Sequence, residues 1–407
     1  FDALSNLGQR DERMPVKSLA TAFINMLAKK TAPLVIFLDE YNLAQSEQTD
    51  ALMRLLVRHL PRHIHLVIAS RWRPDIEIEN LRAHGQLLEI TAADLRFSES
   101  EAAELLAIAG AELDAVQLHR LTDRTEGWPL ALQIASLWLD GDETKAHLVS
   151  DFSGRTSDLA RYLSEQVLTG LPEAQQTFLL ETAILDRING DLANAVTGRR
   201  DGWLMLEQFQ ERNLFLVPTS DDRRWFRYHT LFLDFLRERG QRLFLDRLPD
   251  LHRRAARWLM TEDMIKTAVD HALAADDDDF AARLLSDAGG WRLIMQGRIG
   301  IIRSAFAAIP DAVIRHYPPL MLARVFMLVK DGDVAEARQY FDSIRDREGW
   351  SDQDKIDREV IQHILTDYMD ETITLDEIDH IQTLRQEASR YDHIVQALLT
   401  DSLAAKY

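Results

Sequence analysis

The chain has 407 residues, of which 46% are hydrophobic, and this length leaves room for about three or four domains. It contains no cysteine, which excludes a disulfide framework and a thiolate metal site and fits a reducing cytoplasm. The formal net charge of −19 argues against a broad nucleic-acid-binding surface, which is normally basic. No signal peptide and no run of about 18 apolar residues is visible, so we expect a cytoplasmic protein without membrane contact.

The first 95 residues are predicted to alternate helices and strands, the pattern typical of a parallel sheet. The expected helices have apolar residues at helical spacing, and the expected strands are short apolar runs. These elements are a helix over 16–29, a strand over 34–38, a helix over 52–60, a strand over 65–70 and a short third strand over 87–90.

Two adjacent carboxylates follow the first strand, whose five apolar residues predict burial on both faces of the sheet. Open α/β sheets bind ligands at the carboxyl ends of their strands, where Asp39 and Glu40 lie. In P-loop NTPases the first acid holds Mg²⁺ through water and the second orients the attacking water. The pair therefore predicts a nucleotide site, and a solvated acidic strand end is the alternative.

A phosphate-binding loop requires the string G-x-x-x-x-G-K-[ST], because backbone N–H groups and a lysine surround the phosphates. The 407 residues do not contain this string, and the sequence starts at Phe1 rather than at a methionine. We therefore expect the phosphate loop to lie upstream of the sequence given, and we expect the chain alone to hydrolyse ATP poorly.

After Leu95 the pattern becomes almost entirely helical. Ser98 and Glu101 have the spacing of a capping box, in which each side chain satisfies an N–H at the helix start. Gly127 is placed to end one helix, and Pro129 lies in the first turn of the next, where its missing N–H has no cost.

Residues 156–245 have the order of a winged helix. Helical runs over 158–168, 173–183 and 203–213 precede two β-prone runs, 214–217 and 225–228, that are separated by a turn. The candidate recognition helix, Trp203–Glu211, has no Lys or Arg. This predicts an intramolecular docking or switch module rather than a DNA-binding one.

From residue 246 onward the pattern consists of helix pairs. Asp279–Leu284 and Asp333–Arg338 are alike and each follows a polar turn, as in an α-solenoid of stacked helical hairpins. Their separation defines no fixed repeat period.

Several strings in this order resemble MalT-like regulators, which are LuxR-type transcriptional activators of the STAND class of signal-transduction NTPases. The resemblance covers residues 30–340, and the order and spacing of the strings carry it more than any one of them. The strings are Leu38–Leu43, Leu66–Arg71, Leu95–Ser98, Gly127–Leu132, Asn213–Leu216, Phe226–His229 with Leu231 and Phe232, Leu251–Ala256 and His271–Ala274.

The resemblance implies a mixed, mainly α fold. It would comprise the C-terminal part of a parallel α/β P-loop NTPase-like domain (1–95), a helical subdomain (96–155), a winged helix (156–245), a helical arm (246–320) and the start of a TPR-like superhelical sensor (321–407). It implies ATP or ADP with Mg²⁺ as cofactors and an ADP-bound resting state. A small-molecule or protein inducer at the sensor and ATP would drive self-association. DNA binding would belong to a helix-turn-helix outside this chain.

The resemblance also assigns site residues. Asp39 would be the acid on the Mg²⁺ side and Glu40 the water-orienting one. Arg71 resembles a sensor of the γ-phosphate, the alternatives being a structural ion pair with Asp39 or Glu40, or Arg73 as the sensor. Pro129 resembles a proline beside the adenine, although a helix start explains it too. His229 resembles a histidine that contacts the bound diphosphate, and its alternative is a cap of the following helix.

Two other functions remain open. A non-catalytic helical-repeat scaffold with a degenerate NTPase-like domain is favoured by the missing phosphate-loop string. Direct DNA binding through the winged helix is disfavoured by the acidic charge of the chain.

Overall fold

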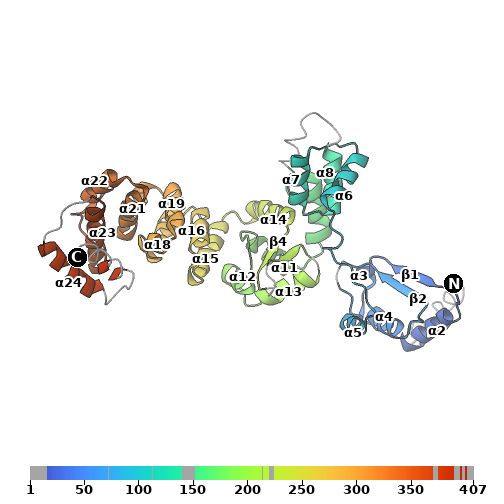
Figure 1. The fold of residues 1–407 in the computed structure, drawn as a ribbon. Helices are drawn as coiled ribbons and strands as arrows, with labels where there is room; N and C mark the ends of the chain where they lie inside the picture. The colour runs from blue at the N-terminus through green and yellow to red at the C-terminus, as the bar shows by residue number, and fades with distance from the viewer. Residues whose placement is uncertain are drawn as a thin grey trace. The chain divides into compact units, whose positions relative to one another are not determined.

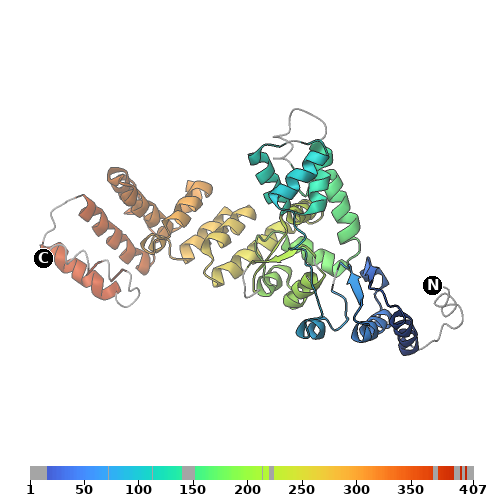
Figure 2. The same cartoon turned by 45° about the vertical axis from the view of Figure 1, so that its right-hand side comes forward.

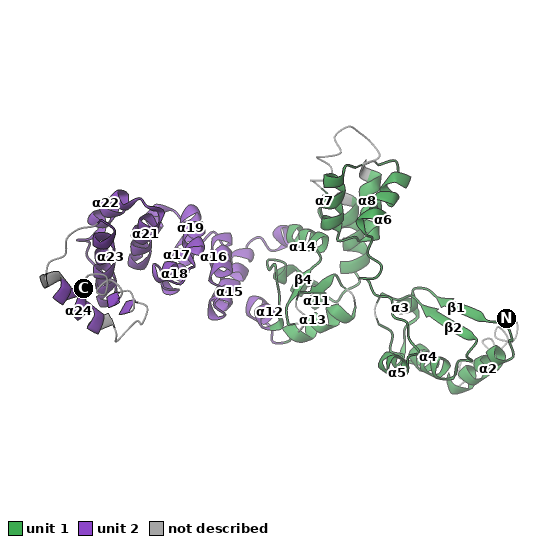
Figure 3. Ribbon diagram, in the orientation of Figure 1, with its two compact units in different colours: residues 1–190, 201–239 green, residues 191–200, 240–407 purple. Residues whose placement is uncertain are grey.

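We analysed a computed structural model of the chain (Figure 1). The structure describes residues 16–71, 73–111, 113–139, 152–212, 214–219, 224–369, 375–388, 395–396 and 399–400. The chain divides into two compact units (Figure 3). The first comprises residues 1–190 and 201–239, and the second comprises 191–200 and 240–407.

The first unit begins with a small parallel sheet covered by helices. Strands β1 (Leu34–Leu38) and β2 (Ile64–Ile68) pair in parallel, with Leu38 opposite Ile68. Residues of the sheet, of α2 and of α4 pack around a core of Tyr41, Met53, Leu56 and Ile76. The predicted helices and the parallel pairing are thereby confirmed. The helices of this part are α2 (Val16–Ala28), α3 (Tyr41–Ala44), α4 (Glu47–His59) and α5 (Ile78–Ala83).

The second face of this sheet is open, so the expectation that the first strand is buried on both faces is wrong. Side chains alternate along a strand, and Phe37 and Val67 point away from the helices, with 72% and 43% of their surface exposed. The expected third strand over 87–90 is also wrong. In the part of the chain that the structure describes, this segment pairs with no strand, and a segment without a partner forms no ladder.

Three helices form the next group, α6 (Glu99–Ile108), α7 (Ala115–Thr125) and α8 (Pro129–Leu139). Both contacts of the Ser98–Glu101 capping box are present. The turn between α7 and α8 requires glycine at Gly127, because φ is +68° and a Cβ there would lie 2.4 Å from the carbonyl oxygen of Phe97. Figure 2 shows the three helices from a second side.

The following elements have the winged-helix order and confirm the predicted hairpin. Strands β3 (Leu216–Pro218) and β4 (Phe226–Tyr228) are antiparallel, and Ile188 bridges to Phe226. A π-helical segment, η1, continues α10 without a break. The helices are α10 (Ser157–Tyr162), η1 (Leu163–Leu168), α11 (Glu173–Thr182), α13 (Gly202–Glu211) and α14 (Thr230–Leu243).

The second unit is helical throughout its described residues and is built from packed neighbouring helices, as expected from the sequence. One helix in it was not predicted: α12 (Gly190–Thr197), whose residues from Asp191 onward belong to this unit. The others are α15 (Leu248–Thr261), α16 (Ile265–Ala274), α17 (Asp278–Asp287), α18 (Arg292–Met295), α19 (Ile299–Ala308), α20 (Asp311–Ile314), α21 (Pro318–Asp331), α22 (Val334–Ile344), α23 (Asp352–Tyr368) and α24 (Leu375–Ala388).

A buried carboxylate, Asp357 on α23, holds α18 in this unit. It is 1% exposed, and it accepts hydrogen bonds from both Nη atoms of Arg292 at 2.5 and 2.7 Å. The indole N–H of Trp291 donates to it at 3.1 Å, and the Gln353 amide donates at 2.9 Å. Because all of these donors point to one carboxylate, its loss removes the acceptor that they share.

We expect Asp357→Ala to lower the free energy of unfolding by about 3–5 kcal/mol, because it leaves the Arg292 charge without its partner. Urea unfolding followed by circular dichroism would measure this. Asp270→Ala removes an acid from the exposed ion pair with Lys266 on α16 and should change little. Equal effects of the two substitutions would contradict the role given to Asp357.

Candidate nucleotide-binding site

The carboxyl ends of β1 and β2 are tied together by main-chain hydrogen bonds. The N–H of Ala69 donates to the carbonyl of Leu38 at 2.8 Å, and the N–H of Tyr41 donates to the carbonyl of Ala69 at 3.0 Å. Asp39 and Glu40 follow β1, and Arg71 follows β2. The structure therefore brings the predicted acids and the predicted sensor arginine to the same edge of the sheet.

Glu40 and Arg71 form an ion pair at this edge. The Nε of Arg71 lies 3.6 Å from Oε2 of Glu40, and each side chain is 47% exposed. Arg71 also donates to the carbonyl of Gln166 at 3.4 Å. The ion pair is the alternative weighed from the sequence, and the sensor role remains a prediction. Arg73, the other candidate, pairs with Glu79 at 2.8 Å.

Asp39 is exposed and anchors the backbone that follows it. Its Oδ1 accepts the N–H of Glu40 at 2.9 Å, and Glu40 has φ 49° and ψ 42°, a left-handed conformation. Mg²⁺ is typically held by one or two carboxylates together with waters and substrate phosphates, so this donor set fits it. Among the described residues no three His, Cys, Asp or Glu side chains are grouped to hold a metal by themselves.

His229 lies directly before α14, where its ring contacts aromatic side chains and the main chain at the end of α7. Only 6% of it is exposed, and its ring meets those of Trp128 and Phe215 edge-on at 5.8 and 5.9 Å. The N–H of Leu231 approaches Nδ1 at 3.3 Å, and Nε2 lies 3.1 Å from the carbonyl of Thr125. Because Nδ1 accepts and the carbonyl has no proton to give, we assign the neutral tautomer with the proton on Nε2.

The sequence-based alternative for His229, a cap of the next helix, is thus also a feature of the structure. Burial lowers the pKa of His229, and the positive charges of Arg96 and Arg227 act in the same direction, against the opposite effects of Glu126 and the Thr125 carbonyl. Contact with a diphosphate would require Nε2 to leave the Thr125 carbonyl.

Glu126 is the main polar contact of this region, and the sequence reasoning missed it. Its oxygens accept both Nη atoms of Arg227 at 2.7 and 2.8 Å, and Oε1 also accepts the N–H and hydroxyl of Thr230 at 3.0 Å each. Burial would raise the pKa of Glu126, but the hydrogen bonds from Arg227 and the Thr230 N–H outweigh it and lower the pKa to about 2. We call Glu126, Arg227, His229 and Thr230 the junction cluster.

Pro129 is the first residue of α8 and is partly buried. Its helix-start role is confirmed, while its contact with an adenine remains a prediction. The preceding Trp128 packs against Phe215 at 5.0 Å and Tyr162 at 6.1 Å, which makes it a core residue of this region.

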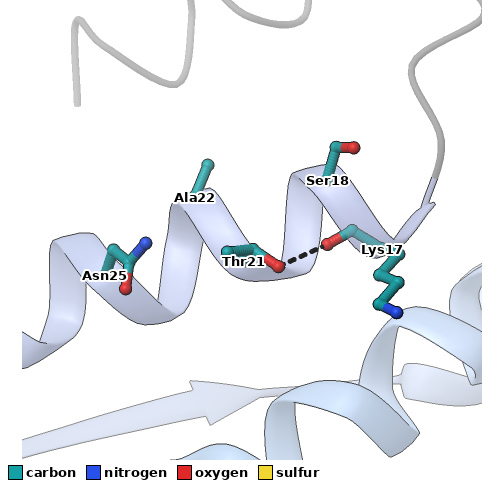
Figure 4. A pocket seen from close by; sticks show the side chains of 5 residues that line it. All are labelled: Lys17, Ser18, Thr21, Ala22 and Asn25. Atoms are coloured by element: carbon teal, nitrogen blue, oxygen red, sulfur yellow. Dashed lines mark hydrogen bonds between the residues drawn. The ribbon is translucent and has the colours of Figure 1, made fainter.

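A hollow on the described surface lies away from these residues. It is an open hollow of about 600 Å³ on the polar face of α2 (Figure 4). It is lined by Lys17, Ser18, Thr21, Ala22 and Asn25, and Thr21 donates its hydroxyl to the carbonyl of Lys17 at 2.7 Å. It includes none of the predicted site residues.

Comparison with known proteins agrees with the fold. Residues 164–248 match the family model of the MalT winged helix domain. The HTH-type transcriptional regulator MalT of Klebsiella pneumoniae is 32% identical over 323 residues, which are 79% of this chain and 36% of that protein. The chain is MalT-like. The predicted resemblance to MalT-like proteins and the mainly α fold with a winged helix are therefore confirmed.

Two further proteins are similar to this MalT-like chain. The serine/threonine-protein kinase PknK of Mycobacterium tuberculosis is 36% identical over 266 residues, which are 65% of this chain and 24% of the kinase. The chain thus spans 36% of the first relative and 24% of the second. A STAND protein with a tetratricopeptide repeat sensor, PH0952 of Pyrococcus horikoshii, aligns with a TM-score of 0.40 and 14% identity over 98% of this chain and 55% of that one.

Within the described ranges, the length and hydropathy of every helix fall short of what crossing a membrane requires.

The junction cluster predicts a stability that falls with acid in two steps. His229 has a lowered pKa when folded, so its contribution is complete above the ordinary value of 6.5 and declines below it. Glu126 contributes above its ordinary value of 4.5 and loses this as the pH falls toward about 2, a shift equivalent to about 3 kcal/mol. Urea unfolding at a series of pH values would measure both steps.

Glu126→Gln should reduce the lower step and leave the upper one, because the amide does not titrate, while other carboxylates with lowered pKa values, such as Glu101 and Asp277, still contribute. Glu165, an exposed acid on η1, supplies the control substitution Glu165→Gln. A lower step that persists unchanged in Glu126→Gln would contradict the assignment.

Proposed function

We propose that this chain is the central region of a signal-transduction ATPase that regulates transcription. It would switch between an ADP-bound resting state and an oligomeric state that forms with ATP and an inducer. The observation that carries the proposal is the edge of the sheet at which Asp39, Glu40 and Arg71 meet. Ligand sites of open α/β sheets lie at this edge, outside the carboxyl ends of the strands.

The roles of these residues follow from their charges. Asp39 would hold Mg²⁺ through water, and Glu40 would orient the water that attacks the γ-phosphate. Arg71 would leave its ion pair with Glu40 when a γ-phosphate offers a more negative partner, and so distinguish ATP from ADP. When bound, Mg²⁺ would neutralise negative charge on the phosphates.

Pro129 and His229 would complete the site from the helical group and the winged helix, with Pro129 near the adenine and His229 near the diphosphate of ADP. In the resting state the nucleotide would thereby join several parts of the chain. A nucleotide shifts such an equilibrium only through its different affinities for the two states, so ADP must bind the closed state more tightly.

The two relatives support a switch rather than an output module. One is named as a transcriptional regulator and the other as a protein kinase, yet both share sequence with this chain. The region of sequence that such different proteins share is best explained as a module that controls their activity. DNA binding would then belong to a module outside this chain, as its net charge of −19 also favours.

Other parts of the proposal concern partners and place. A small-molecule or protein inducer would bind the helical repeats of the second unit, which we take as the start of a TPR-like sensor. The activated protein would self-associate, and it would work in the cytoplasm without membrane contact.

The deciding experiment is to purify the longest natural form of the protein without added nucleotide, denature it and identify the released nucleotide by chromatography. Near-stoichiometric ADP is the expected result. No released nucleotide, together with no binding of added ATP and Mg²⁺, would favour a non-catalytic helical-repeat scaffold instead.

In the same protein, Asp39→Ala and Glu40→Gln should each reduce ATP turnover by about a hundredfold or more, because one removes the Mg²⁺ ligand and the other the water-orienting carboxylate. Steady-state phosphate release would measure this. Asp75→Asn, at an exposed acid of the same domain, is the control and should keep turnover. Unchanged turnover in both site variants would refute the assignment.

A further inference from the structure

The side chain of Asn42 lies between the two halves of the candidate site. It follows Glu40 in the first turn of α3, and only 7% of it is exposed. Its Oδ1 accepts the main-chain N–H of Arg71 at 3.0 Å. Its Nδ2 donates to Oε2 of Glu40 at 3.3 Å. One amide therefore connects the end of β1 with the end of β2.

The orientation of this amide follows from its partners. A main-chain N–H only donates, so the oxygen of Asn42 must face Arg71. An ionised carboxylate only accepts, so the nitrogen must face Glu40. Neither an aspartate nor an aliphatic side chain of similar size can satisfy both partners.

Glu40 is a residue whose conformation needs support. A left-handed conformation is unfavourable for a residue with a Cβ, so it persists only where the surroundings hold it. Two hydrogen bonds hold the backbone around Glu40. The N–H of Tyr41 donates to the carbonyl of Ala69, and Oδ1 of Asp39 accepts the N–H of Glu40. Asn42 and Arg71 direct the carboxylate.

We infer that Asn42 is a positioning residue that aligns the Glu40 carboxylate and couples it to the backbone at Arg71. The inference rests on the proposed ATPase function. When the Arg71 side chain turns toward a phosphate, Glu40 loses its ion pair. Asn42 keeps the carboxylate aligned because its own anchor is the main chain of Arg71, which stays in place when the side chain moves.

The test is Asn42→Asp in the longest natural form of the protein. This variant keeps an oxygen for the Arg71 N–H and replaces the donor to Glu40 with a second carboxylate. We expect kcat for ATP hydrolysis to fall at least about tenfold, with KM within about twofold.

Gln45→Glu is the matched control, because it makes the same change of charge close by in sequence. The Gln45 amide donates to Asp50 at 3.2 Å rather than to Glu40. This variant should keep the wild-type kcat. A general effect of a new carboxylate on folding would instead appear in both variants.

The double variant Glu40→Gln with Asn42→Asp tests the contact without any activity. It exchanges donor and acceptor, so it should recover most of the melting temperature that Asn42→Asp loses. The melting temperature therefore still tests the contact between Asn42 and Glu40 if Asn42→Asp folds too poorly for kinetic measurements.

The inference is overturned if Asn42→Asp keeps the wild-type kcat, or if Glu40→Gln restores none of its melting temperature. The proposed function fails separately, when Asp39→Ala and Glu40→Gln leave turnover unchanged. If these two abolish turnover while Asn42→Asp has no effect, the ATPase assignment stands and the role of Asn42 is refuted.

Discussion

The carboxylate of Glu126 connects parts of the first unit that are far apart in sequence. It ends α7 and receives hydrogen bonds from Arg227 on β4 and Thr230 at the start of α14, about a hundred residues later. Its side chain is 9% exposed, so an unpaired charge there would be costly. The contact between the helical group and the hairpin therefore depends on both partners, together with the packing of Trp128 against Phe215. His229, one residue before Thr230, owes its own position beside Thr125 to the same contact.

Local features of the fold could be predicted, because they depend on neighbouring residues. The Ser98 capping box, the glycine after α7 and the proline at the start of α8 each follow from backbone chemistry within a few positions. The two strands followed from their apolar runs. The 87–90 segment is also mostly apolar, but a strand needs a partner edge as well, which composition does not supply.

In the candidate site, too, the sequence predicts where residues lie along the chain but not the contacts that depend on tertiary structure. The sequence placed Asp39, Glu40 and Arg71 at strand ends, and parallel pairing brought them together. Their connection through Asn42 depends on the direction of one side chain and had no sequence signal that we used. The sequence held a weak signal for Glu126, because this acidic residue directly precedes the glycine of a predicted helix-ending turn. Its partner, Arg227, lies about a hundred residues further along the chain, and pairing over such a separation is a property of the tertiary structure.

The edge-on contact between Trp128 and His229 has a practical consequence. The indole is held 5.8 Å from an imidazole that the structure keeps neutral, beside Phe215. An imidazolium quenches the fluorescence of a nearby indole far more effectively than a neutral imidazole does. The intrinsic fluorescence of Trp128 is thus a built-in optical reporter of this contact. A fall in its brightness on acidification would mark protonation of His229 while the two rings are in contact, with no attached dye.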